Sequence, residues 1–488
     1  MNTASFLYTY IRKNILTPLE YVTDRINIVH VLLLSLLLAG CSIIFQKGGF
    51  LHPESTIYLP YYLSERPLLN KLYDSNILDG GQFQARELSY FFDFIDSKFI
   101  ALSVSLGYPH FLSLTHYLFS ILIGLIIWQL GVRELTLKPL IGAGIVVLFW
   151  TSPSVFLCNY SRSAKIGVAL AVTVLSFVIY RILRNDWQNK EYRLPPTTWL
   201  LCFGVAWGAT LFDKQGFFLV CVTIAFLSLW ISAFPSRNIL KLLLAFGASI
   251  ILGLLYNYQI APILTFHLNH YWPNLSFQQI PFKQSMIRPL YIYYGFYYSV
   301  SLFIDTLRFL IGNIPYTACV FLIVIILLSM LFMSIRARIG RKNIKLFSVV
   351  AAGFVMSYML ICLMIAIMVY KHSALLWPDV RRAYYWLPIT SILCMTIAVI
   401  LSLLSKIRFI SQWLLFVFMV IAITGNIYAI PQHRAILLQG HLKSCYENAP
   451  RLLAALRNIK DNHYQPLPDV EQNPVYQYFR KSLGSVRK

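Results

Sequence analysis

The chain has 488 residues, of which 58% are hydrophobic and only 12% are charged. A soluble domain carries about 25% charged residues, so this composition excludes an ordinary soluble protein. The net charge of +22 does not indicate nucleic-acid binding, because the Lys and Arg residues cluster between long apolar segments, where membrane proteins carry them. The apolar runs are continuous rather than alternating, so we expect an all-α polytopic membrane protein and not a β-barrel.

In chain order, residues 1–25 are predicted to form a cytoplasmic or interfacial arm, and residues 26–428 a transmembrane core. About eleven spans are expected. The core includes a long external first loop at 46–110, which carries surface helices, and a second external loop at 257–315. Residues 429–488 are predicted to be a small external C-terminal segment. The spans are expected at about 28–45, 112–130, 140–156, 166–183, 196–212, 216–233, 239–256, 316–335, 347–370, 387–404 and 409–428.

The basic residues predict the orientation of these spans. Nearly half of them lie in the short connections that share a side with the N-terminus. This asymmetry favours a cytoplasmic N-terminus, and an odd number of spans then places the C-terminus outside. We expect the protein in a cell membrane, with a bacterial inner membrane favoured.

The first loop concentrates carboxylates. It holds seven of the 19 acidic residues: Glu54, Glu65, Asp74, Asp79, Glu87, Asp93 and Asp96. Periodicity predicts a helix over 85–99 that lies along the membrane surface with its polar side toward a cleft. That polar side comprises Arg86, Ser89, Asp93, Asp96 and Ser97. The alternative is a solvated amphipathic helix whose acids merely face water.

Cations are expected on the same side as this loop, at the ends of later helices. Arg162 and Lys165 precede the fourth span, and Arg381 and Arg382 precede the tenth. Each could simply anchor a helix at the headgroups. Together they could hold a lipid-linked phosphate, while a loop carboxylate deprotonates an acceptor hydroxyl. Glycosyl transfer from a polyprenyl-phosphate sugar needs both parts.

The chain resembles the GT-C superfamily of integral-membrane glycosyltransferases across most of residues 26–390. The resemblance rests on five stretches, FQARELSYFFDFID, YSRSAK, FDKQGFF, NYQIAPILTFHLNHYWPNLSFQQIP and RRAYYWLP. It implies an inverting glycosyltransferase that acts at the external face, with a first-loop carboxylate as base. Many members carry two adjacent acidic residues soon after the first helix, and this chain has no such pair.

The resemblance also implies roles for individual residues. Asp79 is the first choice for the base, with Asp74 and Glu87 behind it. Asp213 is a candidate contact to the acceptor or to a substrate-binding side chain. The candidate contacts to the donor phosphate are Arg86, Arg162, Lys165, Arg381 and Arg382.

The expected partners are a polyprenyl-phosphate sugar donor, a lipid- or protein-linked acceptor and membrane lipids. No metal site is predicted, because neither the cysteines nor the acids show ligand spacing, although an acidic loop is compatible with a divalent cation. Two alternatives stay open. One is a flippase or transporter of lipid-linked saccharide, which would carry ionisable residues at mid-membrane. The other is a surface-glycan polymerase or ligase, whose large loop would come later in the chain.

Overall fold

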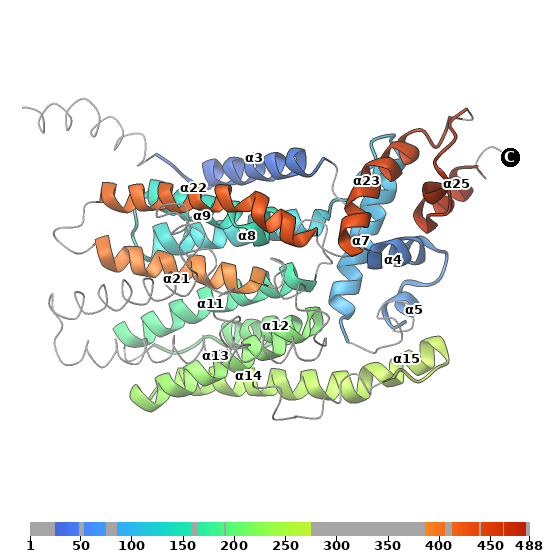
Figure 1. The fold of residues 1–488 in the computed structure, drawn as a ribbon. Helices are drawn as coiled ribbons and strands as arrows, with labels where there is room; N and C mark the ends of the chain where they lie inside the picture. Colours follow the sequence, from blue (N-terminus) through green and yellow to red (C-terminus); the bar gives the residue numbers. More distant parts are fainter. Residues whose placement is uncertain are drawn as a thin grey trace, which may run out of the picture.

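The computed structural model describes residues 25–47, 53–74, 85–157, 164–189, 192–274, 386–405, 412–438, 441–461 and 463–484. Within these ranges every regular element is a helix, as expected. Figure 1 shows a bundle of long helices that run roughly side by side, with a group of shorter helices packed across one end.

Six helical segments in the described part of the chain are long and apolar enough to cross a membrane. They are α3 (Ile28–Gln46), α8 with a π-helical turn (Leu114–Gln129 and Leu130–Glu134), α11 (Ala164–Gln188), α13 (Lys214–Ala233), α14 with its continuation (from Arg237–Leu255 to Asn269), and α22 (Gln412–Leu437). Three shorter apolar helices accompany them: α9 (Pro139–Thr151), α12 (Pro196–Phe212) and α21 (Leu387–Ser405). The spans expected at 316–335 and 347–370 lie outside the described residues, so a total of about eleven stays a prediction.

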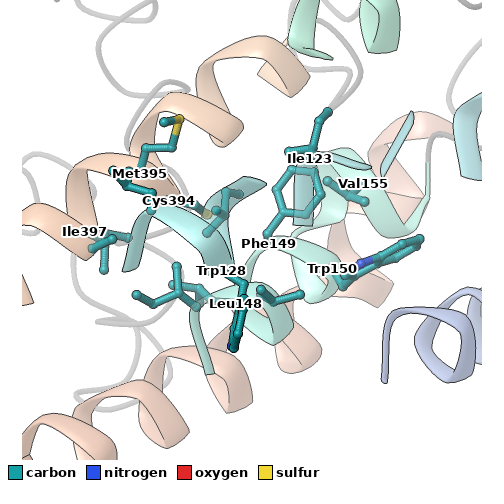
Figure 2. Packing of buried hydrophobic residues seen from close by; sticks show 14 of the residues in the cluster. Ile123, Trp128, Leu148, Phe149, Trp150, Val155, Cys394, Met395 and Ile397 are labelled. Carbon is teal, nitrogen blue, oxygen red and sulfur yellow. The ribbon is translucent and has the colours of Figure 1, made fainter. Parts of the chain in front are cut away.

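The largest hydrophobic cluster joins α8, α9 and α21 (Figure 2). Phe149 and Trp150 are fully buried in it. Gly124 of α8 faces Val146 of α9 so closely that an added Cβ would lie 3.2 Å from the valine side chain. Small residues at such crossings let two helix backbones approach closely. In lipid, where the hydrophobic effect does not drive helices together, this close packing stabilises their association. By contrast, outward-facing side chains such as Ile44 and Leu244 are 78% and 62% exposed, which suits a lipid environment.

Local sequence explains where several helices begin. Asn27 caps α3 by accepting hydrogen bonds from the backbone N–H groups of Val29 and His30. Ser236 caps α14 in the same way. Proline occupies the first turn of α9 and α12, where its missing N–H costs nothing.

Several predicted boundaries are wrong. Helix α11 continues to Gln188 and α22 to Leu437, past the expected ends at 183 and 428. Two further differences have a local cause. The third span was expected as one helix over 140–156, but α9 ends at Thr151 and a short helix, α10 (Pro153–Phe156), follows. Ser152 has ψ of 133° because a residue that precedes proline is kept out of the helical region. The seventh span was expected to end near Tyr256. Instead, a π-helical turn (Tyr256–Ile260) carries the chain into α15 (Ala261–Asn269), so the first part of the expected second loop is helical. The wider turn precedes Pro262, whose missing N–H interrupts the regular ladder.

The group of helices across the end of the bundle comes from both ends of the chain (Figure 1). The first loop supplies α4 (Pro53–Leu63), α5 (Leu68–Leu72) and α7 (Glu87–Ser105). The C-terminal segment supplies α23 (His441–Arg457), α24 (Pro468–Glu471) and α25 (Pro474–Gly484). A shared hydrophobic cluster, which includes Leu59, Val104, Leu456 and Phe479, joins them. The predicted helix over 85–99 is confirmed as α7, which runs further, to Ser105.

Candidate functional site

A buried ion cluster lies where the first loop meets the bundle. Asp213, in the turn between α12 and α13, accepts a hydrogen bond of 2.8 Å from Nζ of Lys165, near the start of α11. Its other oxygen lies 3.0 Å from Nη2 of Arg86, at the start of α7. The Asp213 side chain is only 2% exposed, and those of Lys165 and Arg86 are 10% and 20% exposed. The cluster therefore joins three segments that are distant in sequence.

Two glycines allow this approach. A Cβ on Gly167 of α11 would overlap the ring of Phe212, which directly precedes Asp213. A Cβ on Gly216 would overlap the backbone oxygen of Ala209, across the tight turn between α12 and α13. Glycine at both positions lets the Asp213 turn pack directly against α11, which brings the carboxylate within reach of Lys165.

Electrostatics keep Asp213 ionised. Burial works to raise the pKa of Asp213, but the charges of Arg86 and Lys165 outweigh it and hold the pKa well below its ordinary value. The backbone N–H of Gln215, which donates to Asp213 at 2.9 Å, acts in the same direction and caps α13. Two cations share this carboxylate, so Arg86, Lys165 and Asp213 together carry one net positive charge.

A carboxylate and two phenols form a second polar group, which begins at the residue after Arg86. Glu87 follows Arg86 in α7 and is buried. The hydroxyl of Tyr256 hydrogen-bonds to Glu87 and lies 2.6 Å from the hydroxyl of Tyr73. Tyr256 opens the π-helical turn after α14, and Tyr73 follows α5. Nothing in the sequence singled out these two tyrosines, because the contact depends on the unexpected continuation of α14.

Asp74 belongs to a separate polar group. Its carboxylate accepts hydrogen bonds from Arg66 at 2.9 Å, from the Tyr61 hydroxyl at 2.9 Å and from the Tyr271 hydroxyl at 3.0 Å. Burial, together with the hydrogen bond to Asp74, raises the pKa of Tyr61. Asp74 thereby ties the first loop to the segment that follows α15. Three donors occupy the oxygens of this carboxylate, which is a poor arrangement for a base.

Asp96 is also committed to a structural contact. It accepts hydrogen bonds from the side chain of Ser113 and from the backbone and side chain of Thr115, at the start of α8. The polar side of α7 was expected to face a cleft, and this is wrong for Asp96 as well as for Ser89 and Ser97, because all three are buried. Asp93, on the same helix, is half-buried. Asp96 therefore fixes α7 on α8 and lies outside the ion cluster.

The structure brings together only part of the predicted site. Arg86, Lys165 and Asp213 form one cluster, and Glu87 directly follows Arg86 in the chain. Asp79, the first choice for the base, lies outside the described residues, as do Arg162, Arg381 and Arg382. Among the described residues, no group of three or more His, Cys, Asp or Glu side chains is placed to hold a metal ion. A divalent cation stays a prediction from composition.

Comparison with known proteins adds no relative: no protein-family model, no curated protein and no solved structure matches this chain.

Proposed function

We propose that the protein is an inverting glycosyltransferase that moves a sugar from a polyprenyl-phosphate carrier to a lipid- or protein-linked acceptor. One observation carries the proposal: Arg86 and Lys165 share a single buried carboxylate, Asp213, and the buried loop carboxylate Glu87 directly follows Arg86 in the chain. The guanidinium of Arg86 and the amine of Lys165 suit the anionic oxygens of a phosphodiester, and the Glu87 carboxylate suits an acceptor hydroxyl that must lose its proton. The site would act at the external face of a bacterial inner membrane.

The position of the buried charges favours this function over a transporter. In the described part of the chain, the buried charged residues all lie in the first loop or within two residues of a helix end: Lys71, Asp74, Glu87, Asp96, Lys165 and Asp213. A transport path would be expected to place ionisable groups near the middle of the helices. Charges at the helix ends fit chemistry on a phosphate held at the level of the headgroups.

The hydrogen bonds of the described carboxylates favour one of them as the general base. Asp74 is held by three donors, whereas Glu87 is buried and directly follows Arg86, which belongs to the cluster that would bind the phosphate. Glu87 is therefore the preferred base among the described carboxylates, and Asp79 keeps its place as a candidate from the sequence. Arg86 would contact the donor phosphate, and Lys165 would hold Asp213 and add its charge.

The test uses the full chain in lipid nanodiscs with radiolabelled synthetic polyprenyl-phosphate hexoses and pentoses. Release of polyprenyl phosphate from at least one donor is expected. Glu87→Gln or Asp79→Asn should lower turnover by about 100-fold or more, the usual contribution of a general base. The matched control is Glu447→Gln, on an exposed part of α23. Full turnover in Glu87→Gln, Asp79→Asn and Asp74→Asn alike would rule out all three candidate bases.

A second variant examines donor binding. Arg86→Gln leaves Asp213 paired with Lys165, so the fold should persist while KM for the donor rises. An unchanged KM would remove Arg86 from the proposed phosphate contacts.

A further inference from the structure

Three side chains from three segments form a continuous hydrogen-bonded chain. Glu87 opens α7, Tyr256 opens the π-helical turn after α14, and Tyr73 follows α5. Tyr256 hydrogen-bonds to Glu87, and the Tyr256 and Tyr73 hydroxyl oxygens are 2.6 Å apart. The Tyr73 side chain is half-buried, so the chain leads from a buried carboxylate toward water.

The surroundings fix this arrangement. The ring of Trp207 in α12 packs edge-on against Tyr256, with ring centroids 6.4 Å apart. Ala85 and Ala261 are buried and pack with the two tyrosines, where larger side chains would separate them. Tyr256 is the first residue of the π-helical turn, and single π turns inside helices occur frequently at functional sites.

The direction of the hydrogen bonds follows from the chemistry. An ionised Glu87 can only accept, so Tyr256 donates to it, and Tyr73 in turn donates to Tyr256. When Glu87 becomes protonated, the same chain can reverse, with Glu87 donating to Tyr256 and Tyr256 donating to Tyr73.

We propose that Tyr256 and Tyr73 form a proton relay. The relay removes the proton that Glu87 has taken from the acceptor hydroxyl and so returns Glu87 to its ionised form. This role rests on the proposed function. The Glu87 proton passes to the Tyr256 oxygen while the Tyr256 proton passes to the Tyr73 oxygen. In the same step the Tyr73 proton passes to water. Each phenol gains and loses one proton together, so neither becomes charged, and Glu87 returns to the carboxylate. Both tyrosines act through Glu87 and are positioning residues.

Other charged groups near Glu87 set the background for any titration. Arg86 neighbours it in α7, and through Arg86 the cluster includes Asp213 and Lys165. Substitution of either tyrosine by Phe leaves these three charged groups in place. The effect of the tyrosines on the protonation of Glu87 can therefore be measured separately from the effect of the charges.

The closing experiment measures the protonation of Glu87 directly and does not depend on turnover. Infrared spectra of the nanodisc-embedded protein are recorded against pH, and subtraction of the Glu87→Gln spectra isolates the Glu87 carboxyl band. Tyr256→Phe removes a hydrogen bond to a carboxylate, so the midpoint should rise by roughly one pH unit. Tyr73→Phe should shift it less, in the same direction, because Tyr73 acts only through Tyr256. The control is Tyr478→Phe, which loses a hydrogen bond to the Leu63 backbone and should shift nothing.

Turnover supplies the second readout. The acid limb of the pH profile for donor consumption should move with the infrared midpoint, and the solvent isotope effect should fall in both Phe variants but not in Tyr478→Phe. An unchanged infrared midpoint in Tyr256→Phe, or isotope effects equal to wild type in both Phe variants, would overturn the relay. Absence of turnover on every donor in the wild type would overturn the proposed function instead, while the infrared arm still decides whether the tyrosines hold Glu87.

Discussion

Replacement of Asp213 by Asn should destabilise the protein by about 3–5 kcal/mol, because removal of one partner from a buried ion group leaves uncompensated charge. Asn retains a side-chain oxygen for the Gln215 backbone N–H, and Asn and Asp cap helices about equally well, so the helix cap contributes little to the loss. The cost arises from Lys165 and Arg86. Lys165 is 10% exposed and should bear most of it, since Arg86, at 20% exposure, can turn further toward water.

The chain supplies a matched control at another site. Glu134 also lies between two cations, with Arg181 at 3.2 Å and Arg184 at 3.0 Å. These arginine side chains are 56% and 37% exposed, so solvent screens them, and Glu134→Gln should cost under about 1 kcal/mol. Each site holds one carboxylate between two cations, but we expect very different losses of stability from the two substitutions, because only the Asp213 site is buried.

The assay is unfolding of both variants by increasing SDS in dodecyl maltoside micelles, followed by far-ultraviolet circular dichroism. In the Asp213→Asn background, Lys165→Met should recover at least about 1 kcal/mol, because it removes a cation that has lost its partner. If Asp213→Asn stays within about 1 kcal/mol of wild type, or matches Glu134→Gln, buried charge does not hold the cluster together.

Three further predictions concern other positions. Gly216→Ala should destabilise by about 3 kcal/mol, since its Cβ would overlap the Ala209 backbone, whereas Gly208→Ala, with open space around it, should stabilise the helix by about 0.5–1 kcal/mol in the same micelle assay. Burial raises the pKa of Asp96 to about 7, above its unfolded value of about 3.9, so the folded state holds this proton longer. Its contribution to stability should therefore be full below about pH 4 and lost as pH rises through about 7, and Asp96→Asn should flatten that slope; a slope unchanged by the substitution would contradict it. Asp74→Asn should loosen the first loop and speed its cleavage by trypsin, and an unaltered digestion rate would show that the three donors are dispensable.

Sequence patterns predicted the helices that depend on composition. Apolar runs located α3, α11 and α13 closely, since a long apolar stretch must satisfy its backbone internally in lipid. Periodicity located α7 as well. The errors occurred where one residue decides a boundary, as at Ser152 before a proline, or where a helix continues through a π turn after α14.

The sequence predicted several residues of the candidate site but not which of their side chains contact each other. The expected grouping of Arg86, Lys165 and Asp213 on one side of the bundle matches their observed cluster. The sequence could not show that Asp213 would lie between the two cations, because that depends on close packing at Gly167 and Gly216. Nor could it show that Asp96 binds the start of α8, because its partners there, Ser113 and Thr115, are uncharged and did not stand out in the sequence.

The sequence by itself determined the class of the protein and the concentration of charge near the ends of its helices, because hydropathy and charge act on each segment separately. Only the tertiary structure decided which carboxylate meets which cation. Such pairs form between segments far apart in the chain, and their energies depend on burial that no single segment encodes. The seven first-loop acids look equivalent in sequence, yet packing commits Asp74 and Asp96 to structural contacts and buries Glu87 directly after Arg86 of the ion cluster.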